Sequence, residues 1–157
     1  MTTEYYSGGV ELLDEVGPLW EKLNRHHARL APAFSDFILK RTFAERKAGL
    51  IQKAGPGRLR VDLARVMPDG RLVGYAISTI DEERRGEIDS IYVETDYRGA
   101  GVGQALMERA LAWMDEQEVH HRFLFVRVGN EAALGFYRRF GFVPATIRLE
   151  QLTETKD

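Results

Sequence analysis

Residues 93–106 read Val-Glu-Thr-Asp-Tyr-Arg-Gly-Ala-Gly-Val-Gly-Gln-Ala-Leu, with Gly99, Gly101 and Gly103 close together. An alternating strand pattern precedes this segment and helical spacing follows it, so it joins a strand to the first turn of a helix. That first turn has backbone N–H groups without partners, and the helix dipole adds partial positive charge. Because glycine has no side chain to keep a ligand away, the turn is suited to a phosphate or pyrophosphate, with Arg98 beside it.

Two common nucleotide-binding motifs do not fit this turn. A dinucleotide fingerprint that begins at Gly99 requires glycine where Gln104 stands, and no Gly-Lys-Ser or Gly-Lys-Thr follows to make a P-loop. The alternative to a phosphate site is a tight strand-to-helix connection in which glycine serves the turn geometry.

The chain before the turn predicts two helices and then three strands. One helix covers residues 18–30, with Asp14 as a candidate N-cap, and a second runs from Ser35 or Asp36 to Ile51 and stops before Gly55-Pro56-Gly57. Alternation of apolar and polar residues predicts strands over 59–64, 72–80 and 87–93, which form an antiparallel meander.

The chain after the turn predicts helix, strand, helix and strand. Helical spacing covers residues 101–118, and the apolar run 123–126 suits a strand that is covered on both faces. A helix capped by Asn130 ends at Gly141, and a last strand spans residues 142–152. The strand–helix–strand unit from residue 87 to residue 128 places two strands in parallel, so we expect an α+β fold with a mixed, mostly antiparallel sheet in one domain, residues 1–157.

Composition excludes several classes of function. The 22 basic residues against 24 acidic residues leave a net charge of −2, which does not favour nucleic acid or an anionic membrane. The absence of cysteine excludes disulfides, thiolate nucleophiles and cysteine metal sites. No secretory signal or membrane-spanning run is visible, and a cytoplasmic protein is expected. The adjacent pairs His26-His27 and His120-His121 lack metal-ligand spacing, so no metal is expected.

Two segments carry a specific resemblance. Residues 98–103 read Arg-Gly-Ala-Gly-Val-Gly and match the Arg/Gln-x-x-Gly-x-Gly/Ala signature of the GCN5-related N-acetyltransferase family. Residues 130–142 read Asn-Glu-Ala-Ala-Leu-Gly-Phe-Tyr-Arg-Arg-Phe-Gly-Phe and resemble the family's Asn-x-x-Ala-x-x-Phe-Tyr-x-x-x-Gly-Phe segment. The resemblance covers residues 59–145 well, the N-terminal helices only in their order, and the C-terminal region poorly.

The resemblance implies the family's fold, with one splayed pair of parallel strands, and acetyl-coenzyme A as cosubstrate. In the family the pyrophosphate rests on the backbone of the glycine-rich turn, the pantetheine arm pairs with the exposed edge of the preceding strand, and an N–H near Val93 polarises the thioester carbonyl. The coenzyme-binding residues that it implies are Ile91, Tyr92, Val93, Arg98, Gly99, Ala100, Gly101, Val102, Gly103, Gln104, Asn130 and Tyr137.

The chemistry of direct transfer calls for a base, because an amine attacks only when it is neutral. Glu87, Asp89, Ile91 and Val93 alternate onto one strand face, and Asp89 stands where related polyamine-type acetyltransferases carry a carboxylate. Asp89 is therefore the candidate base or amine-binding anion, with Glu87 second. Alternation does not say which face is the cleft, so two solvated carboxylates are the alternative.

The resemblance also assigns an acid. Tyr137 corresponds to the family tyrosine that protonates the departing thiolate, and its alternative is an aromatic residue packed in the core. Asn130 resembles the family asparagine that contacts the pantetheine or steadies its loop, and helix capping explains it nearly as well.

The sequence therefore predicts an N-acetyltransferase that acts on a primary amine. The alternative is a non-catalytic acyl-coenzyme A sensor on the same fold. The acceptor amine stays open, since no recognised motif occurs in the first helices. The short C-terminal region leaves a sheet edge that a second subunit can cover, so a homodimer is compatible with the sequence.

Overall fold

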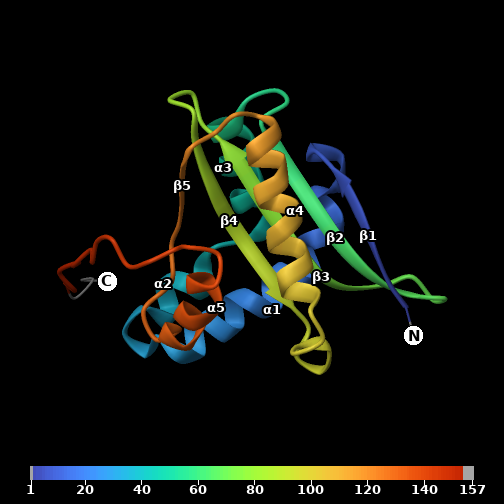
Figure 1. The fold of residues 1–157 in the computed structure, drawn as a ribbon. Helices are drawn as coiled ribbons and strands as arrows, with labels where there is room; N and C mark the ends of the chain where they lie inside the picture. Colours follow the sequence, from blue (N-terminus) through green and yellow to red (C-terminus); the bar gives the residue numbers. More distant parts are fainter. Residues whose placement is uncertain (1, 154–157) are drawn as a thin grey trace.

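The computed structural model describes residues 2–153. Within this range the strands form one sheet in the order β1-β2-β3-β4-β5 (Figure 1). The strands are β1 (Thr2–Gly8), β2 (Leu59–Met67), β3 (Arg71–Ile80), β4 (Arg85–Val93) and β5 (His121–Leu124). The helices are α1 (Leu13–Leu30), α2 (Ser35–Lys40), α3 (Phe43–Ala54), α4 (Val102–Glu116) and α5 (Leu134–Arg138). No helix in the described range is both long and apolar enough to cross a membrane.

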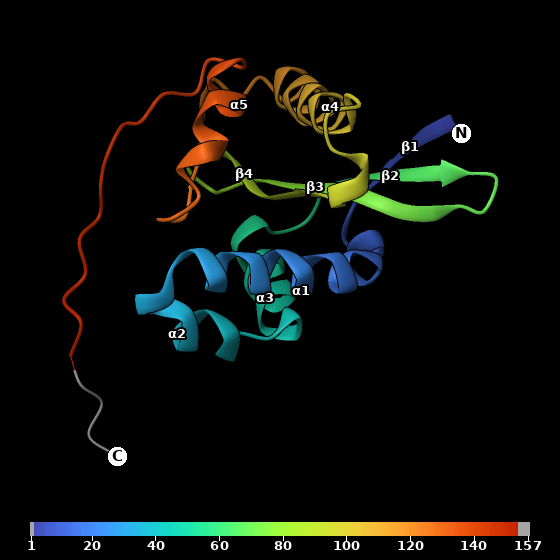
Figure 2. The same cartoon turned by 90° about the horizontal axis from the view of Figure 1, so that it is seen from below.

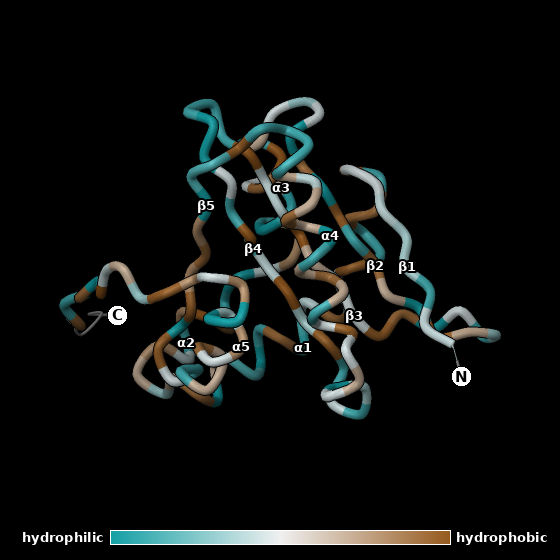
Figure 3. The backbone as a smooth tube through the Cα atoms, in the orientation of Figure 1, coloured by the Kyte–Doolittle hydropathy of each residue, from teal (hydrophilic) through white to brown (hydrophobic). Residues whose placement is uncertain are grey.

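The sheet lies between two layers of helices. Figure 2 shows α4 and α5 over one face and α1, α2 and α3 over the other. On the α1 and α3 face, Leu13, Trp20 and Leu50 pack with Leu63 and Tyr75 of the sheet. On the α4 face, residues such as Met107 and Met114 pack against Ile80 and Ile88. In Figure 3 the loops beyond the ends of the strands are mostly teal to white, while brown stretches run along the strands and helices.

The predicted sheet topology is confirmed. β2, β3 and β4 form the antiparallel meander, and β4 pairs in parallel with β5 from Arg85↔His121 to Ile88↔Leu124. The sequence reading missed β1, which pairs antiparallel with β2 along its whole length. β1 is an edge strand with only half-buried Thr3, Tyr5 and Gly8, so its hydrophobic pattern is weak.

Two helix predictions were wrong at their boundaries. α1 begins at Leu13, ahead of Pro18, and Asp14 lies in its first turn, where it suits the helix dipole, and is not the N-cap. The predicted helix from residue 35 to residue 51 is two helices, because Thr42 starts α3 by accepting a hydrogen bond from the Glu45 N–H at 3.1 Å. The Thr-x-x-Glu spacing is a capping-box signal, and it was present in the sequence.

The predictions after α4 were also partly wrong. β5 lies two residues earlier than expected, because it follows β4 only as far as Leu124, and Phe125 is 80% exposed instead of covered. The last helix shortens to a 3-10 turn and α5, and the Asn130 side chain does not cap it. The strand predicted over 142–152 does not form, because that segment pairs with no strand in residues 2–153. Gly141 has the expected left-handed conformation, at φ +88°.

One glycine holds the loop after β5 against α1. Gly129 has φ +92°, and a Cβ there would lie 2.1 Å from the Leu30 carbonyl oxygen. We expect Gly129→Ala to lower the free energy of unfolding by about 2 kcal/mol, from left-handed strain and overpacking together. Gly141→Ala is the matched control, since it carries the same strain in open space and costs only about 1 kcal/mol. Urea unfolding measures both, and equal losses would contradict the close contact.

Candidate active site

The glycine-rich turn leaves open backbone N–H groups at the start of α4. Gly99 and Gly101 have φ +81° and +86°, and a Cβ at either glycine would meet nothing within 4 Å. Gly101 is the N-cap residue of α4, and no side chain caps the helix. The first hydrogen bond of the helix runs from the Ala105 N–H to the Gly101 carbonyl at 3.0 Å, so the N–H groups of Val102, Gly103 and Gln104 have no helical acceptor. The turn thus has room and donors for an anion.

The edge of β4 next to the turn is also open. β5 pairs with β4 only as far as Ile88, and Figure 1 shows β5 running away from β4 below that point. The carbonyl of Asp89 accepts from Arg46 Nη2 at 2.8 Å, and that of Val93 from Arg98 Nε at 2.8 Å. Backbone groups alternate in direction along a strand, so Ile91, between these two residues, points its N–H and carbonyl toward the same open side.

A β-bulge at Asp89 overturns the prediction that four side chains share one face of β4. Ile77 pairs with Ser90, and the next residue of β3, Ser78, pairs with Ile88, so Asp89 is the extra residue. A bulge shifts the alternation by one position. Glu87 and Asp89 therefore point to the α3 side, where Lys53 binds them. Ile91 and Val93 instead pack on the α4 side.

Lys53 joins the two carboxylates. Its Nζ lies 2.7 Å from Asp89 Oδ1 and 2.8 Å from Glu87 Oε1, and Thr79 Oγ1 donates to Asp89 Oδ2 at 2.6 Å. The side chain of Asp89 is 1% exposed and that of Glu87 is 13% exposed. The alternative prediction, that Glu87 and Asp89 are two solvated carboxylates, is therefore wrong. Neither carboxylate is free to bind an amine directly.

The electrostatics of this cluster bring the pKa of one carboxyl group closer to neutral pH. Burial, and then the charge of Glu87, raises the pKa of Asp89 to about 6, although Lys53 and Thr79 oppose the shift. Burial alone would lower the pKa of Lys53, but Asp89 and Glu87 raise it above its ordinary value. The cluster is suited to hold a proton that arrives from elsewhere.

The raised pKa of Asp89 makes stability depend on pH. Between pH 3.8 and about 6 the folded state keeps a proton that the unfolded state releases, so this group's contribution to stability falls as pH rises through that window. Asp89→Asn has no such group, so we expect the free energy of unfolding of Asp89→Asn minus that of the unmodified protein to rise from pH 4 to pH 6. Urea unfolding at several pH values measures this difference. His27 acts in the opposite direction, because burial lowers its pKa to about 4, but its contribution cancels in the difference. Asp69→Asn, in an exposed turn, controls for loss of a carboxylate, and parallel pH curves for Asp89→Asn and the unmodified protein would contradict the expectation.

Tyr137 lies on α5, over the α4 face of the sheet. It packs in the same apolar cluster as Ile88 and Ile91, and this brings it to the open stretch of β4. Burial raises the pKa of Tyr137 to about 12, so the phenol stays protonated at neutral pH. None of the described residues forms a hydrogen bond with its hydroxyl, which makes it available to a ligand.

Two other predicted residues lie differently from expectation. Asn130 lies in the loop between β5 and α5, and its side chain forms no hydrogen bond within residues 2–153. The Arg98 side chain points away from the start of α4, because its Nε binds the Val93 carbonyl and its guanidinium lies over the Tyr92 ring, 5.4 Å from the centroid. The backbone N–H of Arg98 donates to the Thr95 carbonyl at 3.3 Å, so the predicted turn donors are reduced to the backbone groups of residues 99–104, without that guanidinium beside them.

The sequence analysis did not predict Lys53 and Arg46 as residues of the site. Both approach β4 from α3. These residues are seven positions apart, so they lie on one face of the helix. Glu87 and Asp89 themselves were the signal that could have found Lys53. Two carboxylates on a buried strand are expected to pair with a cation from an element that packs against the strand.

Comparison with known proteins shows which family this chain belongs to. The sequence model of the Acetyltransferase (GNAT) family matches residues 23–142. The chain is 35% identical over 88 residues to mycothiol acetyltransferase of Streptomyces coelicolor, which covers 55% of this chain and 28% of that protein. It is 34% identical over 86 residues to the putative [ribosomal protein bS18]-alanine N-acetyltransferase of Bacillus subtilis, covering 55% and 56% of the two chains.

A solved structure shows the same fold. The GCN5-related N-acetyltransferase from Ralstonia eutropha superposes with a TM-score of 0.67 at 21% identity, over 96% of this chain and 99% of that chain. The matches to the two curated relatives span about a quarter to just over half of each relative's length.

Proposed function

Because the chain belongs to the Acetyltransferase (GNAT) family, we propose that it transfers the acetyl group of acetyl-coenzyme A directly to a primary amine. One observation carries the proposal: the open edge of β4 leads straight to the open N–H groups at the start of α4. A pyrophosphate fits the open N–H groups at the start of α4, and the arm attached to it fits the open edge of β4 at Ile91. A cytoplasmic location remains the expectation from the sequence.

The backbone makes the coenzyme site in this proposal. The N–H groups of residues 99–104 hold the pyrophosphate, and Ile91 and Val93 pair with the pantetheine arm. Gly99 and Gly101 have no neighbour where a Cβ would stand, so the phosphates approach the N–H groups closely there. An N–H near Val93 polarises the thioester carbonyl, on which negative charge develops in the transition state. We assign Asn130 to the arm only because the resemblance implies it.

Two groups of this chain move protons in the proposed reaction. The neutral amine attacks the thioester carbon, so that a C–N bond forms as the C–S bond breaks. Tyr137 donates its phenolic proton to the departing sulfur. The amine proton passes through water to the cluster of Glu87, Asp89 and Lys53, where the pKa of Asp89, about 6, suits a proton acceptor. Glu87, the more exposed carboxylate, is the point of access.

The alternative function is a non-catalytic acyl-coenzyme A sensor. The observation in its favour is that Lys53 and Thr79 occupy both oxygens of Asp89, as in a purely structural ion pair. Calorimetric titration with acetyl-coenzyme A, followed by a panel of primary amines with detection of released thiol, separates the two. Binding with turnover supports the transferase, binding without turnover on any amine supports the sensor, and no binding contradicts both.

We also propose that the chain forms a homodimer through its C-terminal segment. Residues 142–153 leave the body of the fold as an extended segment, with Ile147 and Leu149 exposed and alternating with Arg148 and Glu150. In Figure 3 this segment alternates between brown and teal. The outer edge of β5 has no strand neighbour within residues 2–153, and a strand-like segment of a second copy would complete it. Light scattering of Leu149→Glu against the unmodified protein tests this, and equal masses would contradict it.

A further inference from the structure

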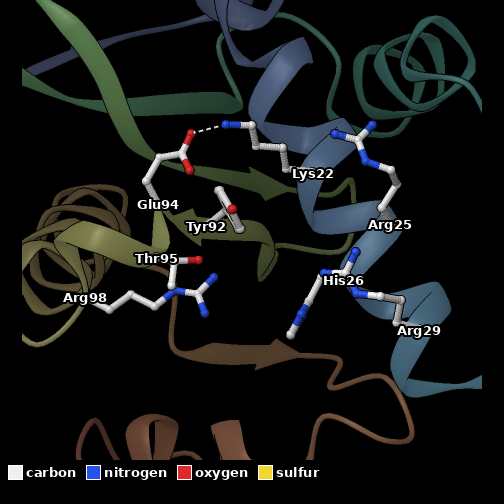
Figure 4. Close-up of a pocket in the computed structure, with 8 residues that line it drawn as sticks. All are labelled: Lys22, Arg25, His26, Arg29, Tyr92, Glu94, Thr95 and Arg98. Carbon is white, nitrogen blue, oxygen red and sulfur yellow. Dashed lines mark hydrogen bonds and ion pairs between the residues drawn. The ribbon is translucent and has the colours of Figure 1, made fainter.

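A pocket lies between α1 and the end of β4. Its volume is about 270 Å³, and Figure 4 shows side chains of both elements and of the following turn around it. The lining residues are Lys22, Arg25, His26, Arg29, Tyr92, Glu94, Thr95 and Arg98. Of these, only Tyr92 and Arg98 were predicted to belong to a functional site.

The pocket carries excess positive charge. Its one carboxylate, Glu94, is paired with Lys22 at 2.5 Å, as the dashed line in Figure 4 shows. Arg25, Arg29 and Arg98 form no ion pair with any acid among residues 2–153. Three guanidinium groups around one small space repel each other unless an anion joins them. Burial, and then the charges of Arg98 and Arg29, lowers the pKa of His26, which shows the same field.

The pocket lies on the face of β4 opposite the start of α4. Tyr92 belongs to the apolar cluster between the sheet and α1, whereas Ile91 and Val93 pack toward α4. Arg98 reaches this face by passing over the Tyr92 ring. Glu87 and Asp89 point to the same side of the sheet, and Tyr92 follows Asp89 by three residues, or about 10 Å of strand. A pocket on this face lies on the side from which an amine near those carboxylates would arrive.

Positive charge continues from the pocket along the gap beside β4. Arg46 binds the Asp89 carbonyl, and burial followed by the charge of Arg46 lowers the pKa of Arg127 and of Arg41. His27 is linked to this group, since Arg127 and His26 both help to lower its pKa. Glu45 and Glu150 offset only part of this charge. This group of positively charged side chains repels polycationic amines and attracts amines that also carry a negative group.

We propose that this pocket binds a carboxylate or phosphate group carried by the acceptor, so that the preferred substrate is an amine that also carries an anionic group. The inference rests on the proposed acetyl transfer. Planar guanidinium forks bind carboxylate and phosphate in a bidentate manner, and Arg25 and Arg29, one helical turn apart on α1, present two such forks on one face. Coenzyme A also carries phosphates, so the experiment has to separate the two sources.

The first arm uses inorganic phosphate as the probe and the NMR signal of the His26 ring as the readout. With coenzyme A bound to saturation, phosphate should still give a saturable shift of His26, and Arg25→Gln/Arg29→Gln should weaken that binding at least about fivefold. Arg58→Gln/Arg84→Gln removes the same charge outside the pocket and should leave the binding unchanged. If coenzyme A blocks phosphate, the pocket belongs to the coenzyme, and if no saturable shift occurs there is no anion site. Either result overturns the proposal.

The second arm uses an ω-amino acid and its terminal amide as matched acceptors. We expect the acid to have a kcat/KM roughly fivefold higher than the amide, and Arg25→Gln/Arg29→Gln to remove this difference without changing the KM for acetyl-coenzyme A. A rise confined to the KM for acetyl-coenzyme A would overturn the assignment to the acceptor. Calorimetry with acetyl-coenzyme A, done in parallel, shows separately whether the proposed transferase function itself has failed.

Discussion

Gly101→Asp is expected to lower the affinity for acetyl-coenzyme A at least about a thousandfold, because it places a carboxylate where the pyrophosphate is proposed to bind. The side chain has room, since a Cβ at Gly101 meets nothing within 4 Å, so the loss would come from charge and not from a steric clash. Calorimetric titration measures the affinity directly.

The backbone of Gly101 requires its own control. Its φ of +86° is left-handed, and both Asp and Asn pay some strain there. Gly101→Asn has the same shape without the charge, so we expect a loss of no more than about tenfold, from strain alone. Equal losses for the two variants would show that the turn binds no anion, and unchanged affinity in Gly101→Asp would remove the pyrophosphate from the start of α4.

Tyr137→Phe should lower kcat about a hundredfold with little change in the affinity for acetyl-coenzyme A, since it removes a proton donor and keeps the ring. Burial raises the pKa of Tyr137 to about 12, so the phenol is the protonated form over the whole neutral range. Its ring packs in the apolar cluster beside Ile91, and phenylalanine fills the same space. Steady-state rates on an accepted amine, together with calorimetry, measure the two quantities.

A matched substitution separates the acid role from a general effect of losing a hydroxyl. Tyr6→Phe lies on β1, at the far edge of the sheet, where the hydroxyl donates only to Glu4 at 2.6 Å. It should leave kcat unchanged. An unchanged kcat in Tyr137→Phe as well would remove Tyr137 from the acid role, and a large loss of coenzyme affinity would make it a binding residue instead.

Much of the fold could be predicted from local patterns. The meander, the helix after the glycine-rich turn and the parallel pair all follow from spacing within short segments, since each element carries its own periodicity. β1 could not be found in this way, because an edge strand with half-buried side chains needs its partner β2 to define it. The strand prediction for residues 142–152 was wrong for the opposite reason. This segment has the pattern of a strand, but no strand in the described chain pairs with it.

The candidate site also has parts that could be predicted from local sequence patterns and parts that could not. The turn from Arg98 to Gln104 and the position of Tyr137 were readable, because each belongs to a continuous motif. The side of β4 on which Asp89 lies was not readable, because the bulge at this residue arises from the register with β3. The pairing of Asp89 with Lys53 joins residues 36 positions apart.

The sequence by itself determined that a glycine-rich turn leads a strand into an uncapped helix, since chain chemistry over a few residues settles both the turn and its open N–H groups. Only the tertiary structure decided where charge is gathered around that turn. It places the Arg98 guanidinium over the Tyr92 ring, on the other side of a pocket from Arg25 and Arg29, and it pairs Glu87 and Asp89 with Lys53. The reason is physical: charge energies depend on distance and burial, and packing sets both between residues that no local pattern connects.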